Sequence, residues 1–173
     1  LEKILKITKK IKPVNGRLEK IGRLNNNGIV ILDYAHTPDA LETCIKDIKE
    51  QFKLRKINLV FGCGGDRDKP KRKIMGRIAN KYCNKIYLTD DNPRNEDPKI
   101  IVAQIVKDMH LKNFDIIFDR KEAIYEGLKK LKKLERESVL LIAGKGHENS
   151  QILEDREIEF NDLKILNELK DVI

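Results

Sequence analysis

The chain has 173 residues, of which 40% are hydrophobic, which suits one domain with a buried core and argues against intrinsic disorder. Its formal net charge of +8 would suit a nucleic-acid partner, but the lysines alternate with acids and only 5% of residues are aromatic. A base-stacking surface needs more rings, and no apolar run approaches the roughly 20 residues of a membrane span. We therefore expect neither nucleic-acid binding nor membrane insertion.

Cysteine and histidine usage argues against a disulfide framework and against a metal site. The three cysteines are Cys44, Cys63 and Cys83, an odd number without CxxC spacing. Such usage is typical of a reducing compartment. The three histidines are far apart in the sequence and lack the spacing of zinc ligands. We therefore expect a cytoplasmic protein in which this chain holds no metal.

The first eleven residues, LEKILKITKKI, place apolar side chains along one helical face, and Pro13 ends this predicted helix. Charged residues interrupt the segment, unlike the apolar centre of a signal peptide. The chain begins with Leu1 rather than Met, so we expect it to be part of a longer protein.

From residue 15 onward, short apolar runs alternate with amphipathic segments. The expected strands cover residues 15–24, 29–36, 56–62, 85–90, 114–119 and 138–144. The expected helices cover residues 38–52, 71–83, 99–110, 120–134 and 161–170, and a small hairpin is expected at 152–160. Thr37 and Asn161 are placed to cap two of these helices. The alternation predicts an α/β fold with a Rossmann-like, mostly parallel sheet, helices on both faces and a small C-terminal hairpin.

The loops that follow the predicted strands are the main physical argument for a binding site. Parallel strands end at one edge of the sheet, and ligands bind at that edge in open α/β folds. Four of the five strands from residue 29 onward are followed by loops rich in Gly, Pro, His, Asp or Arg: DYAHTP, GCGGDRD, TDDNPR and AGKGHE. The remaining loop, DRKEA, is plainer.

The loop GCGGDRD, residues 62–68, has three glycines, and two interpretations stay open for it. Glycine lets a backbone approach a phosphate or ribose closely, or it forms a tight strand-to-helix turn. The loop is not GxGxxG and the chain has no Walker motif, so a nucleotide would need groups from elsewhere. Cys63 has no base beside it and is interpreted as a spectator thiol.

His36, Lys145 and the basic run at residues 69–73 each have an interpretation that does not involve a ligand. His36, in DYAHTP, would contact a nucleotide, act as a base, or simply lie in a turn before a helix. Lys145, in AGKGHE, would neutralise a phosphate or be solvated, among glycines that permit positive φ. The run KPKRK, residues 69–73, is interpreted as compositional bias.

The stretch TDDNPRNEDP presents Arg94 on a rigid acidic loop. Taken alone, it favours an Asn-Pro turn with a solvated arginine over a clamp for a carboxylate. Glu96 and Asp97 fall just before the next predicted helix, where negative charge suits the helix dipole.

Taken in order, GRLE, DYAHTPDAL, GCGGDRDKPKR, TDDNPR and AGKGHE resemble the carboxyl-terminal part of the Mur ligases, from about residue 13 to the last helix. The DNPR form is similar to that of members that add meso-diaminopimelate. The resemblance implies that residues 1–12 end a central ATPase domain and that residues 13–173 form the C-terminal, amino-acid-binding domain. It also implies an ATP-dependent ligase of peptidoglycan synthesis that works through an acyl phosphate.

The resemblance further implies a set of site residues. Those expected to bind meso-diaminopimelate are Arg67, Asp91, Asn92, Pro93, Arg94, Gly144 and Glu148. Arg94 would form a fork to the far carboxylate, and Glu148 with the Gly144 carbonyl would accept hydrogen bonds from the far ammonium. Those expected on the nucleotide side are Tyr34, His36 and Asp66. No catalytic residue is assigned to this chain.

The resemblance also implies cofactors and partners. ATP and Mg²⁺ would be bound mainly outside this chain, which lacks the P-loop, so the fragment alone would be inactive. The second substrate would be UDP-MurNAc-L-Ala-D-Glu, and the protein would be a monomer. The alternative is a basic α/β module that binds nucleic acid or a nucleotide without ligase activity.

Overall fold

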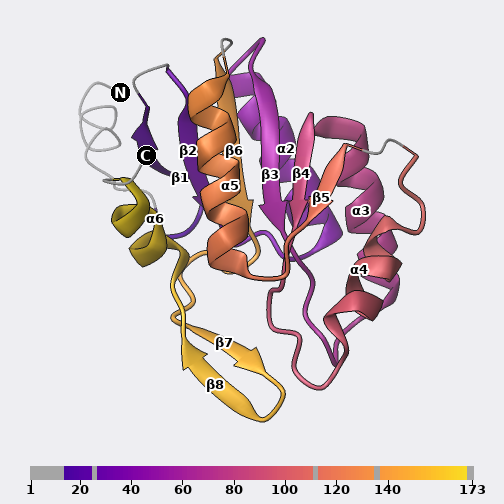
Figure 1. Cartoon of the computed structure of the whole chain (residues 1–173). Helices are drawn as coiled ribbons and strands as arrows, with labels where there is room; N and C mark the ends of the chain where they lie inside the picture. Colours follow the sequence, from indigo (N-terminus) through magenta and orange to yellow (C-terminus); the bar gives the residue numbers. More distant parts are fainter. Residues whose placement is uncertain (1–13, 25–26, 111–112, 135–136, 171–173) are drawn as a thin grey trace, which may run out of the picture.

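A computed structural model of the chain describes residues 14–24, 27–110, 113–134 and 137–170. The helix predicted at residues 1–11, and the domain boundary expected after residue 12, lie outside these described residues. Within them, a six-stranded sheet carries helices on both faces, and a two-stranded hairpin lies beyond one edge of the sheet (Figure 1). The predicted α/β fold is confirmed.

The large sheet has the strand order β1-β2-β6-β3-β4-β5. Its strands are β1 Glu19–Arg23, β2 Ile29–Asp33, β3 Lys56–Phe61, β4 Lys85–Leu88, β5 Phe114–Ile116 and β6 Ser138–Ala143. Strand β1 runs antiparallel to β2, and the other pairings in this sheet are parallel. The carboxyl ends of β2, β6, β3 and β4 therefore lie side by side, and the loops that follow them emerge at one edge.

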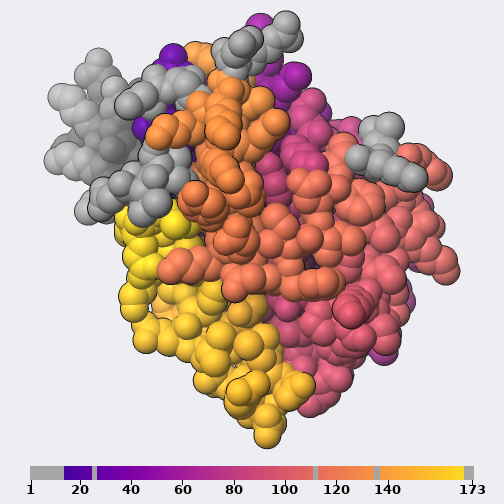
Figure 2. Space-filling view, viewed as in Figure 1, coloured from indigo at the N-terminus to yellow at the C-terminus, as the bar shows by residue number. Residues whose placement is uncertain are grey.

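The helices divide between the two faces of the sheet. One face carries α2 Pro38–Gln51, α3 Pro70–Tyr82 and α4 Pro98–Val106, and the other carries α5 Arg120–Lys133 and α6 Asp162–Lys170. Because both faces are covered, the central strands are continuous apolar runs. Figure 2 shows the face that α5 covers, with the hairpin below it. No helix within the described ranges is long and apolar enough to span a bilayer.

Strand β5 is shorter than the strand predicted at 114–119, because Asp119 turns out of the sheet to cap α5. Its Oδ1 accepts a hydrogen bond of 2.9 Å from a backbone amide in the first turn of that helix. The N-caps predicted at Thr37 and Asn161 are confirmed, since the side-chain oxygen of each accepts a hydrogen bond from a first-turn amide.

The predicted C-terminal hairpin is confirmed as β7 Ser150–Leu153 and β8 Arg156–Glu159. It pairs with the loop that connects β4 to α4. The Arg94 amide donates to the Ile152 carbonyl at 3.1 Å, and the Glu154 amide donates to the Arg94 carbonyl at 2.8 Å. The hairpin thereby holds this loop at the carboxyl edge of the sheet.

Candidate functional site

A cavity of about 430 Å³ opens at the carboxyl edge of the sheet, between the loops that follow β2, β3, β4 and β6. The convergence of these four loops, which the sequence predicted, is confirmed. The predicted site residues that line the cavity are Tyr34, His36, Arg67, Asp91, Asn92, Arg94, Gly144 and Glu148. Pro93 and Asp66 are the two predicted residues that do not line it.

Two glycines of the loop after β3 are required by a neighbouring loop. A Cβ atom at Gly62 would collide with the Thr89 carbonyl oxygen, and one at Gly65 would collide with the Pro93 carbonyl oxygen. The Gly65 amide also donates to the Asn92 carbonyl at 2.9 Å. Close packing of the loops after β3 and β4 thus accounts for these glycines without a phosphate.

The Cys63 thiol of the same loop is buried, and burial raises its pKa to about 12. A thiol with such a pKa is almost entirely protonated at neutral pH and is a poor nucleophile. Its surroundings fit the interpretation of Cys63 as a spectator.

Arg94 is held in an uncommon backbone conformation beside the cavity. Its φ is 52°, in the left-handed region that non-glycine residues rarely adopt. The hairpin bonds to its backbone on both sides, and Nη1 donates to the carbonyls of Gly65 at 2.9 Å and Asn92 at 3.3 Å. These bonds fix the side chain through one nitrogen. Among the described residues, the rest of the guanidinium has no protein partner and can bind an anion.

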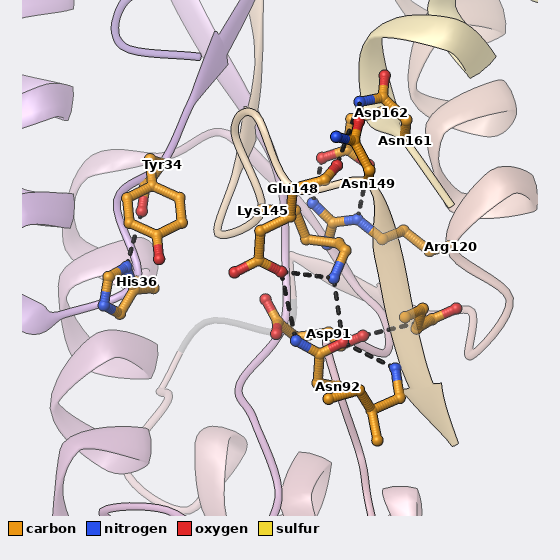
Figure 3. Close-up of polar contacts among 12 residues, drawn as sticks. Tyr34, His36, Asp91, Asn92, Arg120, Lys145, Glu148, Asn149, Asn161 and Asp162 are labelled. Carbon is orange, nitrogen blue, oxygen red and sulfur yellow. Dashed lines mark hydrogen bonds and ion pairs between the residues drawn. The ribbon is translucent and has the colours of Figure 1, made fainter. Parts of the chain in front are cut away.

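Three polar side chains, those of Asn92, Lys145 and Glu148, form a hydrogen-bonded network at the cavity wall (Figure 3). The Lys145 side chain is fully buried, and its Nζ donates to Glu148 Oε2 at 2.8 Å and to Asn92 Oδ1 at 3.1 Å. Asn92 Nδ2 donates to the same Glu148 oxygen at 3.3 Å. Both roles predicted for Lys145 are therefore wrong: it is neither solvated nor exposed to a phosphate, because it is the internal counter-ion of Glu148.

Asp91 places a second carboxylate at the wall of the cavity. Burial raises the pKa of this carboxyl, and the cations Arg120 and Lys145 offset the rise only in part. Gly144 lies against it, with φ of 116°, and a Cβ atom there would lie 2.8 Å from Asp91 Oδ2. Glycine is therefore required at 144 by its conformation and by the space that Asp91 takes.

The basic run KPKRK contains a structural arginine, so its interpretation as compositional bias is wrong at Arg72. This side chain is fully buried and forms a fork to Glu96, from Nη1 to Oε2 at 2.8 Å and from Nη2 to Oε1 at 3.0 Å. It also donates to the Gly64 carbonyl at 2.8 Å and to Gln104 at 2.7 Å. Arg72 thus joins the loops after β3 and β4.

The expectation for the two acids before α4 is confirmed for Asp97 only. Asp97 Oδ1 accepts a hydrogen bond of 2.8 Å from the Lys99 amide as N-cap of α4. Glu96 instead binds Arg72 and accepts from the Asp66 amide at 2.7 Å. Hydrogen bonds from Arg72 are the main reason that the Glu96 pKa is lowered to about 2.

Asp66 connects two loops at the rim. Its Oδ2 accepts hydrogen bonds from the Asn95 backbone amide at 3.2 Å and from the Asn95 side chain at 3.0 Å. Its neighbour Arg67 is exposed and lines the cavity. Pro93 lies outside the cavity but is buried between the two residues that line it, Asn92 and Arg94.

Tyr34 and His36 place aromatic rings at the wall of the cavity. The ring of Tyr34 meets the rings of His36 and His147 at centroid distances of 4.6 and 5.0 Å. The guanidinium of Arg17 lies 5.5 Å from the Tyr34 centroid. Tyr34 and His36 thus both line the cavity, and their rings are in edge contact.

A second buried arginine lies beneath the site and was missed by the sequence analysis. Arg120 forms a fork to Asp162, with distances of 2.9 Å from Nε and 2.8 Å from Nη2, and Nη2 also donates to the Ala143 carbonyl. Burial lowers the pKa of Arg120, but the Asp162 carboxylate more than offsets this, so the pKa is raised. The plain loop DRKEA therefore supplies a support for the strand end that precedes Gly144.

Sequence comparisons match this chain to one family. A family model described as "Mur ligase, glutamate ligase domain" matches residues 16–146. A 2,6-diaminopimelate-adding UDP-N-acetylmuramoyl-L-alanyl-D-glutamate ligase of Rickettsia felis is 47% identical over 169 residues, covering 96% of this chain and 30% of that protein. The protein of Clostridium acetobutylicum with the same name, numbered ligase 1, is 45% identical over 169 residues. The match covers 97% of this chain and 34% of that protein. The chain spans about a third of the length of these curated relatives.

Solved structures agree with the sequence comparisons. A structure of a UDP-N-acetylmuramoyl-L-alanyl-D-glutamate–2,6-diaminopimelate ligase matches with a TM-score of 0.82 and 34% identity, over 98% of this chain and 34% of that one. Folylpolyglutamate synthase from Thermotoga maritima matches with a TM-score of 0.60 and 26% identity, over 83% and 31%. A UDP-N-acetylmuramate-alanine ligase from the same organism, at 18% identity and a TM-score of 0.64, shows the fold alone.

Proposed function

The chain belongs to the Mur ligase family, and from this premise we propose that the protein containing it adds meso-diaminopimelate to UDP-N-acetylmuramoyl-L-alanyl-D-glutamate in peptidoglycan synthesis. The observation that carries the proposal is one cavity lined by the partly free guanidinium of Arg94 and by the carboxylates of Glu148 and Asp91. The alternative of a nucleic-acid or nucleotide-binding module is not favoured, because the relatives of this chain are ligases.

The charges of the cavity suit the far end of meso-diaminopimelate, which carries a carboxylate and an ammonium. In this proposal Arg94 binds the far carboxylate, with Arg67 and Asn92 nearby as further donors. Glu148, Asp91 and the Gly144 carbonyl accept from the far ammonium. Lysine has the ammonium but not the far carboxylate, so it would leave the Arg94 guanidinium without its anion, and such a site discriminates strongly.

The reaction proposed for the intact protein is ATP-dependent amide formation. The substrate carboxylate is phosphorylated to an acyl phosphate, the amine of the incoming amino acid attacks it, and phosphate leaves. The residues of this chain bind and orient the incoming amino acid. ATP and Mg²⁺ are held mainly by the part of the protein outside this chain; its described residues contain no group of three His, Cys, Asp or Glu side chains that could hold a metal ion.

Tyr34 and His36 are proposed to face the nucleotide, since they line the cavity and present aromatic rings. For Asp66 the contact with the ribose stays a prediction, because its Oδ2 already binds Asn95 and the residue lies outside the cavity. We also propose that the protein acts in the cytoplasm as a monomer, with UDP-MurNAc-L-Ala-D-Glu as its second substrate.

Amino-acid preference of the full-length protein tests this proposal. Phosphate release is measured with saturating ATP and UDP-MurNAc-L-Ala-D-Glu while meso-diaminopimelate or L-lysine is varied. We expect kcat/KM to be about 1,000-fold higher for meso-diaminopimelate, because lysine leaves a polar group of the site unpaired. Comparable values for the two amino acids would contradict the proposal.

A further inference from the structure

The fully buried ammonium of Lys145 has an unusual position for a lysine. It lies directly behind the cavity wall without lining the cavity, and its side chain has no exposed surface. Removing a lysine ammonium from water is costly unless other groups compensate it. Its two acceptors, Glu148 Oε2 and Asn92 Oδ1, belong to residues that do line the cavity. The side chain thus acts on the cavity through its neighbours.

Lys145 fixes the orientation of the Asn92 amide. Asn92 Oδ1 accepts from Lys145 Nζ at 3.1 Å and from the Ile152 amide at 3.0 Å, so both donors require the oxygen on that side. A flipped amide would place its NH₂ group against two donors. One hydrogen of Nδ2 is directed to Glu148 at 3.3 Å. What Asn92 can offer a ligand is therefore the remaining N–H, which suits an anion.

Lys145 also leaves Glu148 with one available oxygen. Glu148 Oε2 accepts from both Lys145 and Asn92, whereas Oε1 has no protein partner among the described residues. The Glu148 side chain keeps 32% of its surface exposed, and the residue lines the cavity. Its free oxygen is an acceptor and suits a cation. The Lys145 ammonium therefore leaves Asn92 as a donor and Glu148 as an acceptor toward the cavity.

We propose that Lys145 is a positioning residue that sets the donor–acceptor polarity of the amino-acid site, although the ligand does not touch it. The inference rests on the proposed function and deepens it. A zwitterionic end of a ligand, with its anion at Asn92 and its cation at Glu148, matches this polarity. Without Lys145, Asn92 Oδ1 keeps only the Ile152 amide as a donor and Glu148 loses its counter-ion, so the donor at Asn92 and the acceptor at Glu148 are both held less firmly.

The test uses the full-length protein with Lys145→Met, and Lys164→Met as the matched control. Lys164 lies on α6 and pairs with Glu159 at the surface, away from the cavity. For Lys145→Met we expect KM for meso-diaminopimelate to rise about 30-fold, the effect of weakening one or two charge-assisted hydrogen bonds. KM for ATP should stay within about twofold of the wild-type value, since its contacts are unchanged, and Lys145→Arg should restore part of the loss because it keeps the charge.

A purely structural role would give a different pattern. Lower thermal stability with an unchanged KM for meso-diaminopimelate would overturn the inference. If unmodified protein does not prefer meso-diaminopimelate to lysine, the proposed function itself fails; if it does and Lys145→Met keeps both KM and preference, only this inference fails.

A second variant keeps the inference testable if Lys145→Met does not fold. Asn92→Asp retains an oxygen for Lys145 and Ile152 but replaces the whole NH₂ group, which donates to Glu148 and faces the cavity, with a second acceptor. We expect the preference for meso-diaminopimelate over lysine to fall about 100-fold, because the far carboxylate then meets a like charge. A preference equal to that of the wild type would contradict the polarity assigned to Asn92.

Discussion

Two buried arginine–carboxylate pairs support the site, and they differ in what surrounds them. Arg120 and Asp162 both have fully buried side chains and join α5 to the first turn of α6 beneath the sheet edge. Arg72 is equally buried, but its partner Glu96 keeps 12% of its side-chain surface exposed. Water can therefore reach one carboxylate and not the other. The two bidentate pairs therefore have different roles. Arg120 and Asp162 maintain the fold, and Arg72 and Glu96 hold two loops together.

Removing the cation of the enclosed pair should have the largest effect on stability. Arg120→Met leaves Asp162 charged and without a partner in a site closed to water. We expect the free energy of unfolding to fall by about 4 kcal/mol, the cost typical of breaking a buried pair from one side. Urea denaturation of the protein followed by circular dichroism measures this.

The control for that prediction is Lys121→Met, one residue along the same helix. Lys121 pairs with Glu168 at 3.0 Å, but both side chains are about half exposed, so the loss should be negligible. Equal stability of the Arg120 and Lys121 variants would mean that the enclosed pair does not support the fold.

Removing Arg72, the cation of the partly exposed pair, should cost less stability and affect binding more. In Arg72→Met, Glu96 can turn toward water, so we expect a loss of about 2 kcal/mol, in the range of hydrogen bonds to charged groups. The loops that carry Arg67 and Arg94 lose their connection, so KM for the amino acid should rise about tenfold. Steady-state kinetics of the full-length protein would contradict this account if KM were unchanged.

Acid should weaken the pair of Arg72 and Glu96. The folded pKa of Glu96 is about 2, below its ordinary value of 4.5, so its contribution to stability is complete above about pH 5 and is lost as pH falls toward 2. The stability difference between wild type and Arg72→Met should therefore be constant from pH 7 to 5 and narrow below that. Melting temperatures at pH 7, 5, 4 and 3 measure it, and a constant difference down to pH 3 would contradict the assignment.

The smallest effect is expected at a surface pair that includes Lys164 of α6. Lys164 and Glu159 are 2.8 Å apart, but both are well exposed. Solvent screens such a pair, so Lys164→Met should change neither the melting temperature nor KM measurably. A clear loss would show that exposure is not what separates the two arginine pairs from this one.

The sequence was sufficient for the fold and for the place of the site. Apolar strands buried on both faces are recognisable as continuous runs, and the loops that follow them must meet at one edge whatever their contacts. The ten predicted site residues came from the family resemblance, and eight of them line the cavity.

The buried cations could not be predicted in the same way. Arg72 stands among other basic residues, and its side-chain partners Glu96 and Gln104 lie 24 and 32 positions away. Arg120 is buried because Asp162, 42 positions away, begins α6 beside it. Lys145 lies within a glycine-rich loop that resembles a flexible turn. Burial of a charged side chain depends on such distant partners, which leave no periodic pattern in the sequence.

Recognition of the far carboxylate of meso-diaminopimelate by Arg94 can be tested with Arg94→Ala in the full-length protein. Arg156→Ala, on the exposed strand β8, is the matched control. The account predicts that KM for meso-diaminopimelate rises about 100-fold in Arg94→Ala, with KM for ATP nearly unchanged, because a bidentate charge-assisted contact is lost. A KM for meso-diaminopimelate equal to that of the Arg156 variant would contradict it.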